Sequence, residues 1–202
     1  MENSRNKIKR LIEKELVALQ QIPINDSIDE AVSLIFQQAH KSNAKVVFSG
    51  MGKAGQVGSN IATTFASTGT PAVFLHPSEA QHGDLGILQP NDLLFLVSNS
   101  GKTTEILLLV ELAKKLFPDI PIVCLTGNRS SPLASQADIV LHTGGPEEIC
   151  PLGLTPTTST TVMGVIGDLL VVLLMEKVGF TKSDYARRHH SGYLGEKSRV
   201  DE

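Results

Sequence analysis

Residues 98–103, Ser-Asn-Ser-Gly-Lys-Thr, have the composition of a loop that binds an anion. The loop stands between an apolar run and a helical pattern, so its hydroxyls and N–H groups meet a helix N-terminus, which favours a phosphate. A nucleotide-hydrolysing P-loop is excluded because position 96 is Leu, where that motif needs Gly. Capping of the helix by Ser100 or Thr103, with no ligand, is the simpler alternative.

A second glycine-rich segment follows another apolar run. Gly50, Gly52 and Gly55 fit the G-x-G-x-x-G pattern of dinucleotide-binding turns. A dinucleotide site also needs an acidic residue at the end of the next strand, which here ends in Leu-His-Pro at 75–77. No nicotinamide, flavin or other cofactor is therefore expected. The glycines then form a tight turn that presents Lys53 to a ligand, or a turn with no ligand at all.

Several titratable residues follow other apolar runs. Glu105 lies in the first turn of a predicted helix, where the helix dipole favours its ionised form. Glu147 and Glu148 are adjacent carboxylates, a pattern that is usually solvated. His76 and His82 have a His-x₅-His spacing, but no Cys or acidic pattern completes a metal site. No metal ion is expected.

Apolar runs that alternate with helical patterns must position these residues. The runs are continuous, which is typical of strands buried on both faces of a parallel sheet. The alternation predicts the α/β class: an open, doubly wound sheet of about five parallel strands flanked by helices, with ligands at the carboxyl ends of the strands. Strands are predicted at 46–48, 72–75, 93–97, 122–125 and 139–141, and helices at about 53–68, 104–117, 131–137 and 158–178.

Two amphipathic helices precede the sheet and form an N-terminal helical extension. The first covers 4–21, and the second begins at Ser27, with Glu30 completing a capping box. In the last predicted helix, Gly164 and Gly167 predict close packing against another helix, within the chain or between subunits.

Composition excludes several classes of partner. A formal net charge of -3 gives no electrostatic signature of nucleic acid or of an anionic membrane surface. The apolar stretch 162–175 is short for a membrane span and contains Asp168, which is expected to be a buried helix-contact residue. Two cysteines make no disulfide framework, and the charged N-terminus lacks the apolar core of a signal peptide. A cytoplasmic protein is expected.

Six motifs, in this order along residues 30–195, resemble those of sugar isomerase (SIS) domains. More narrowly, they are similar to D-arabinose 5-phosphate isomerases of the Kdo pathway. The motifs are Ser49–Lys53, Phe65–Pro71, His82–Gly86, Ser98–Gly101, Cys150–Thr157 and Ser159–Thr161.

The resemblance implies an aldose–ketose isomerase that interconverts D-ribulose 5-phosphate and D-arabinose 5-phosphate through an enediolate, for Kdo, lipopolysaccharide or capsule synthesis. Its implied catalytic residues are Lys53, Glu105, Glu148 and His189. The implied substrate-binding residues are Ser49, Gly52, Gly69, Thr70, His82, Ser98, Asn99, Ser100 and Thr103. It also implies a homo-oligomer, a tetramer, in which His189 reaches the active site of a neighbouring chain.

The sequence departs from the family's pattern at three points: two lie in its motifs, and the third is the expected lack of CBS domains. Lys102 stands where the family usually has Glu, and His189-His190-Ser191-Gly192 replaces His-Pro-Gly-Gly, so His190 is an alternative carrier of the histidine's role. The expected organisation is an N-terminal helix at 1–25, a SIS domain at 26–195 and a tail at 196–202, without CBS domains. Two alternatives stay open: an isomerase of another sugar phosphate, and a non-catalytic regulator that binds a sugar phosphate.

Overall fold

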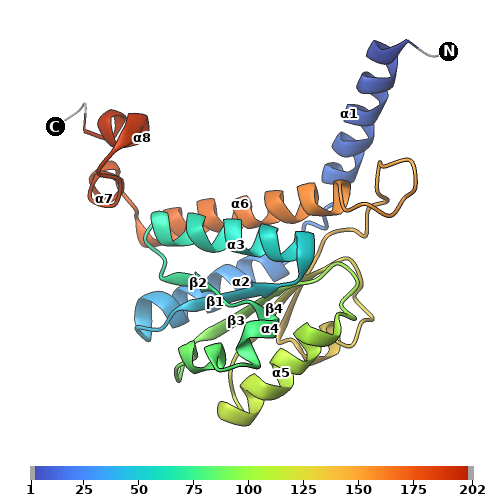
Figure 1. Ribbon diagram of the computed structural model, residues 1–202. Helices are drawn as coiled ribbons and strands as arrows, with labels where there is room; N and C mark the ends of the chain where they lie inside the picture. The colour runs from blue at the N-terminus through green and yellow to red at the C-terminus, as the bar shows by residue number, and fades with distance from the viewer. Residues whose placement is uncertain (1–2, 200–202) are drawn as a thin grey trace.

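All five predicted strands form and pair in parallel in the computed structural model, which describes residues 3–199 (Figure 1). The sheet order is β2-β1-β3-β4-β5. This order reverses direction between β1 and β3, the place where doubly wound sheets bind ligands. The predicted fold class is confirmed. The strands are β1 Val46–Gly50, β2 Ala72–Phe74, β3 Leu93–Val97, β4 Ile122–Thr126 and β5 Ile139–His142.

Helices cover both faces of the sheet. On one face the apolar side chains of α2, α3 and α6 join the core, and on the other face those of α4 and α5 do so. The α-helices are α1 Ser4–Gln20, α2 Ser27–Phe36, α3 Gly52–Ser67, α4 Pro77–Ala80, α5 Thr104–Leu116, α6 Thr158–Val178, α7 Lys182–Ala186 and α8 Gly192–Lys197. A π-helical turn at Gln37–Lys41 follows α2, and short 3₁₀ turns lie at Asp84–Ile87 and Ala134–Gln136.

The central strands hold the core and set the position of the loops. Every residue of β1, β3 and β4 is buried, as the continuous apolar runs predicted. Phe48 and Phe95 are paired in register, and their rings lie 4.7 Å apart. The same register pairs Gly50 with Val97, so the β1–α3 and β3–α5 loops leave the sheet side by side.

Helix α6 has the predicted bounds, Thr158–Val178, and extends beyond the apolar stretch 162–175 at both ends. Its 21 residues are long and apolar enough, by length and composition, to cross a membrane, but half of that window is buried inside the domain. Met163 and Ile166 pack into the core formed with α2 and α3. Asp168 was wrongly expected to be buried: it is exposed, because it projects from the face of α6 that points away from this core.

Two local predictions are wrong. Ser27 does not cap α2: the N-cap is Asp26, whose side chain makes no capping bond, and the Ser27 hydroxyl donates instead to Asn25 Oδ1 at 2.6 Å. The predicted helix at 131–137 is only the 3₁₀ turn Ala134–Gln136. Pro132, at its start, removes a backbone donor.

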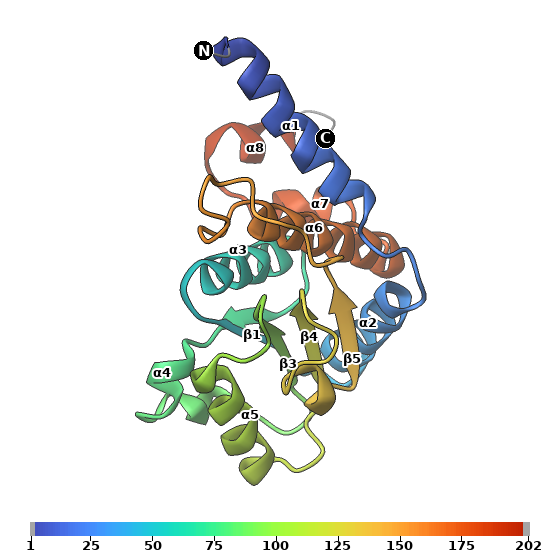
Figure 2. The same ribbon diagram turned by 90° about the vertical axis from the view of Figure 1, so that its right-hand side faces the viewer.

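Helix α1 and the short helices α7 and α8 project from the body of the domain (Figures 1 and 2). Helix α1 leaves near the N-terminal end of α6, whereas α7 and α8 follow its C-terminal end (Figure 1). Only Ala18 of α1 is buried. The helices at 182–186 and 192–197 were not predicted, because each has about one turn and little apolar content.

The two glycines of α6 predict opposite effects of the same substitution. A Cβ at Gly167 would collide with the Ile61 side chain of α3, whereas a Cβ at Gly164 would meet nothing within 4 Å. Gly167→Ala should therefore destabilise the fold, while Gly164→Ala should stabilise it through the better helix propensity of Ala. We expect the free energies of unfolding in urea to differ by about 2 kcal/mol between the variants. Equal effects would show that α3 and α6 do not pack at this distance.

Candidate active site

A cavity of about 250 Å³ opens where β1 and β3 end. Three segments that are distant in the sequence form its wall: the β1–α3 turn, the β3–α5 loop and the start of α6. The residues that line it are Met51, Lys53, Ala54, Val97, Ser98, Asn99, Ser100, Thr103, Pro156, Ser159, Thr160 and Met163.

Three helix N-termini meet at this cavity. Lys53 lies in the first turn of α3, Thr103 is the N-cap of α5, and Ser159 lies in the first turn of α6. The first N–H groups of a helix have no acceptor within the helix, and the helix dipole places about half a positive charge there. The cavity is therefore suited to an anion with several oxygen atoms.

The loop 98–103 is held by its own hydroxyls. Ser98 Oγ lies 3.1 Å from Thr103 Oγ1 and accepts a hydrogen bond from Gly101 N at 3.2 Å. Ser100 Oγ accepts from Lys102 N at 3.2 Å. These bonds fold the loop back on itself, so that its hydroxyls face the cavity at the start of α5.

Glycine is required at the centre of this loop. Gly101 has a φ of +61°, and a Cβ there would collide with the Ser131 side chain. Gly127 also approaches this loop closely, since its N–H donates to Asn99 O at 3.0 Å. The segment that follows β4 thus packs against the loop 98–103.

The β1–α3 turn presents Lys53. Gly50 and Gly55 approach so closely that a Cβ on Gly50 would lie 2.9 Å from Gly55 Cα, so α3 can begin directly at the strand end. Gly52 has a φ of +56° and lies beside the cavity wall rather than in it. Lys53 is exposed, and its Nζ donates to Gln56 Oε1 at 3.2 Å. A long, mobile ammonium thus stands at the mouth of the anion site.

Glu148 caps helix α6. Its Oε2 accepts hydrogen bonds from Thr157 N at 2.7 Å, from Thr157 Oγ1 at 3.0 Å and from Ser159 N at 3.3 Å. Burial raises the pKa of the Glu148 carboxyl, but the bonds from Ser159 and Thr157 outweigh it and leave the pKa below its usual value. Glu148 is therefore an ionised carboxylate at neutral pH, and none of these three bonds uses Oε1.

Glu148 is not part of the cavity wall, and neither are the other predicted acid, Glu105, and the loop histidine, His82. Glu105 is half-buried in the first turn of α5, and His82 is exposed in the β2–β3 connection. Neither side chain lines the 250 Å³ cavity. Their assigned roles in catalysis and in substrate binding stay predictions.

Three predicted substrate contacts lie elsewhere in the chain. Ser49 is fully buried, and its hydroxyl donates to Leu75 O at 2.6 Å, so it joins β1 to the end of β2. Gly69 and Thr70 precede β2 and therefore lie at the opposite, N-terminal end of the strands. Thr70 is buried, and its Oγ1 lies 3.1 Å from His40 Nε2. None of the three lines this cavity within one chain, and their assigned role in substrate binding stays a prediction.

His189 lies between α7 and α8, beyond the far end of α6. Its ring stacks on Tyr185, with centroids 3.7 Å apart, and its Nδ1 is 3.0 Å from Tyr185 O. Helix α6 separates the two ends of the domain by about 30 Å. One chain does not bring His189 to the cavity. His190 is exposed beside it.

The sequence analysis did not assign seven residues of the cavity wall to the site. Three are apolar residues at or shortly after the ends of β1 and β3, and four lie in or just before the first two turns of α6: Met51, Ala54, Val97, Pro156, Ser159, Thr160 and Met163. The Ser159–Thr161 motif was the available signal, but without the structure nothing places the start of α6 beside the strand ends.

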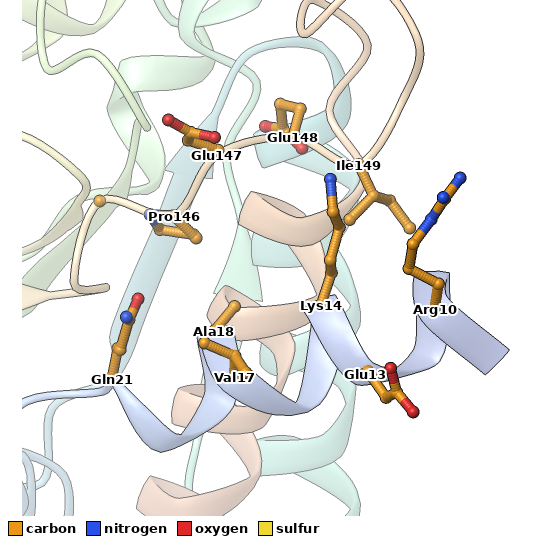
Figure 3. Close-up of a pocket in the computed structure, with 11 residues that line it drawn as sticks. Arg10, Glu13, Lys14, Val17, Ala18, Gln21, Pro146, Glu147, Glu148 and Ile149 are labelled. Atoms are coloured by element: carbon orange, nitrogen blue, oxygen red, sulfur yellow. The ribbon is translucent and has the colours of Figure 1, made fainter. Parts of the chain in front are cut away.

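A second, larger cavity of about 480 Å³ lies between α1 and the β5–α6 loop (Figure 3). Glu147 and Glu148 of the loop line it, together with Lys14 of α1. Figure 3 shows α1 running alongside the segment Pro146–Ile149. Among residues 3–199, no group of three or more His, Cys, Asp or Glu side chains could hold a metal ion.

Comparison with protein families matches residues 40–173 to the SIS domain. The arabinose 5-phosphate isomerase KdsD of Yersinia pestis is 47% identical over 186 residues, which are 92% of this chain and 55% of the relative. The chain thus spans about half the length of the curated relatives it matches.

Two solved structures are similar over their whole length. A Bacteroides fragilis protein named as a phosphosugar isomerase involved in capsule formation has a TM-score of 0.93 and 58% identity, with coverage of 95% of this chain and 100% of that one. A protein of E. coli CFT073 in complex with arabinose 5-phosphate has a TM-score of 0.83 and 37% identity, with coverage of 94% and 100%.

The loop that leads to Pro156 contains a reactive thiol. The Cys150 pKa is lowered to about 7 by hydrogen bonds from Thr155 and Leu154, whereas burial raises the Cys124 pKa to about 12. Native protein should therefore be alkylated by iodoacetamide at Cys150 alone, with a rate that reaches half its maximum near pH 7. Peptide mass spectrometry identifies the site, and Cys150→Ser is the control. A rate that still rises above pH 9 would show that these hydrogen bonds do not form.

Proposed function

The chain belongs to the SIS-domain family, and from this premise we propose that it interconverts D-ribulose 5-phosphate and D-arabinose 5-phosphate. One observation carries the proposal: Lys53 and the hydroxyl loop 98–103 open on one cavity at three helix N-termini. The names of the similar proteins supply the reaction, and Kdo, lipopolysaccharide or capsule synthesis would use the product.

The phosphate of the substrate binds at the start of α5. Ser98, Ser100 and Thr103 supply hydroxyls there, and each hydrogen bond to the charged phosphate contributes about 1.5–3 kcal/mol. Asn99 adds an amide at the same wall. Glu148 does not compete for this place, because its carboxylate is held at the start of α6.

Isomerisation then needs one base and one electrophile. The base takes the proton from C2 of the aldose while the carbonyl oxygen at C1 becomes an enediolate oxygen. A proton then moves from the O2 hydroxyl to O1, and return of the first proton to C1 gives the ketose. Glu148 is an ionised carboxylate bound to Ser159, a residue of the cavity wall, which favours it as the base over Glu105. Lys53 stabilises the enediolate oxygen.

His189 acts in the cavity of a neighbouring chain in this proposal. If two α6 helices pack antiparallel, the C-terminal end of one lies over the N-terminal end of the other, where Ser159 lines the cavity. The segment with His189 then reaches that site and can shuttle the hydroxyl proton or open the sugar ring.

Exposed apolar side chains support such an assembly. Val172 on the outer face of α6 is 52% exposed, and Ile8, Ile12 and Leu16 form a stripe on α1 that is more than half exposed. A single helix of this length is marginal in water, so α1 gains stability when a second copy covers the stripe. We assign a tetramer built from dimers.

Two further assignments belong to the proposal. Residues 26–195 form the unit that carries the site, with 1–25 as a helical extension and 196–202 as a tail. The cytoplasm is the compartment, because the free thiols Cys124 and Cys150 suit a reducing environment.

Turnover tests the proposed function. The purified chain is incubated with D-ribulose 5-phosphate, and D-arabinose 5-phosphate is identified by chromatography. Formation of the aldose supports the proposal. Conversion of a different pentose, hexulose or heptulose phosphate instead would assign another isomerase, and binding without any conversion would assign a regulator.

Lys53→Ala should lower kcat strongly without unfolding the protein, because glycines rather than this side chain build the turn. By comparison with loss of an oxyanion-hole donor, about 2.7–4 kcal/mol of transition-state stabilisation should be lost. Steady-state kinetics measure this, with Lys115→Ala on the far end of α5 as the matched control. An unchanged kcat would remove Lys53 from the mechanism.

Mixing two inactive variants tests whether sites are shared. His189→Ala and Lys53→Ala are each expected to be inactive, and hybrid oligomers should regain part of the activity because some sites then contain both intact residues. Activity is measured after subunit exchange, which is demonstrated with tagged chains. No recovery after proven exchange would mean that each chain completes its own site.

A further inference from the structure

A second carboxylate binds the start of α6 from the side of α1. Glu15 Oε1 accepts a hydrogen bond from Thr158 Oγ1 at 2.9 Å. That hydroxyl in turn accepts from Ile149 N at 3.3 Å. Because a hydroxyl can donate one bond and accept another, Thr158 links helix α1 to the backbone of the residue that follows Glu148.

The two carboxylates hold consecutive residues of one helical turn. Glu148 Oε2 binds Thr157 and Ser159, whereas Glu15 binds the intervening Thr158. Thr158 is 1% exposed, so this link is shielded from water. The position of Glu148 therefore depends on two attachments: its own bonds to α6, and the anchoring of Ile149 through Thr158 to α1.

Attachment of helix α1 through the Glu15 carboxylate has a free-energy cost. Its Oε2 is buried and has no hydrogen-bond partner among the described residues. A buried carboxylate oxygen without a partner costs free energy that an apolar side chain would not. Packing of α1 alone does not explain a carboxylate here, but orientation of the Thr158 hydroxyl does, because Glu15 accepts its proton and leaves its lone pairs toward Ile149.

We propose that Glu15 is a positioning residue for Glu148, so that helix α1 is part of the catalytic apparatus. Its catalytic consequence rests on the proposed function, but the link itself does not. Without Glu15 the Thr158 hydroxyl can turn away from Ile149. The segment from Glu148 to Ser159 then loses one of its two attachments, and the Glu148 carboxylate samples positions from which it does not reach C1 and C2 of the sugar.

Substitutions at both ends of the link test the proposal. Glu15→Ala and Thr158→Val should each lower kcat about tenfold. KM should change less than about twofold, because neither substitution alters the proposed phosphate-binding loop 98–103. Glu15→Gln and Thr158→Ser should keep near-normal kcat, since an amide oxygen still accepts and a serine hydroxyl still relays. The double variant Glu15→Ala/Thr158→Val should be no worse than either single variant.

Amide hydrogen exchange tests the same link in the absence of substrate. In Glu15→Ala the segment 148–159 should exchange about tenfold faster than in wild type, and in Glu15→Gln it should not. Glu13→Ala is the matched control, because Glu13 is an exposed glutamate on the same helix. If the wild-type chain fails to isomerise ribulose 5-phosphate, the proposed function fails, and hydrogen exchange still decides the role of Glu15.

Three results would overturn the proposal. They are unchanged exchange and kcat in Glu15→Ala, a loss in Glu15→Gln as large as that in Glu15→Ala, and additive losses in the double variant. Circular dichroism shows whether each variant folds. If Glu15→Ala does not fold, the comparison of Thr158→Val with Thr158→Ser decides, because both variants leave the buried carboxylate in place.

Discussion

The convergence of three helix N-termini on one cavity is the constraint on which this structure depends. Helices α3, α5 and α6 each bring a positive dipole end to the ends of β1 and β3, and at α6 the Thr157 and Ser159 N–H groups already donate to Glu148. Such a concentration of positive potential in a folded core needs a compensating anion. The close approach of Gly50 to Gly55, and the left-handed Gly101, let the helices start near enough to share that anion.

The positive dipole ends of the three helices are compensated in different ways. The start of α6 carries the chain's own carboxylates, Glu148 and Glu15. The starts of α3 and α5 present Lys53 and the hydroxyls of residues 98–103 instead. The cavity wall therefore contains a lysine and several hydroxyls but no carboxylate, and the two acids bind the start of α6 from outside this wall. Helix α1, distant in sequence, is joined to the start of α6 through Glu15.

The sequence predicted what local patterns determine and missed what tertiary packing determines. Continuous apolar runs located the buried strands, and residues 98–103 and Lys53 line the cavity because strand ends are local features. Ser49 is buried against Leu75, and Thr70 lies beside His40 at the opposite end of the strands. Both positions depend on tertiary neighbours that a local sequence pattern does not predict. The Glu15–Thr158 bond joins positions 143 residues apart, so only the folded chain shows it.

The most direct test of the central claim is amide chemical-shift mapping of the ¹⁵N-labelled chain during titration with D-arabinose 5-phosphate. The claim is that the sugar phosphate binds where α3, α5 and α6 begin. The largest shift changes should fall on the amides of residues 53–54, 98–100, 103 and 159–160, since these residues line the cavity. Changes centred on residues 10–21 and 145–149, around the larger cavity beside α1, would contradict it.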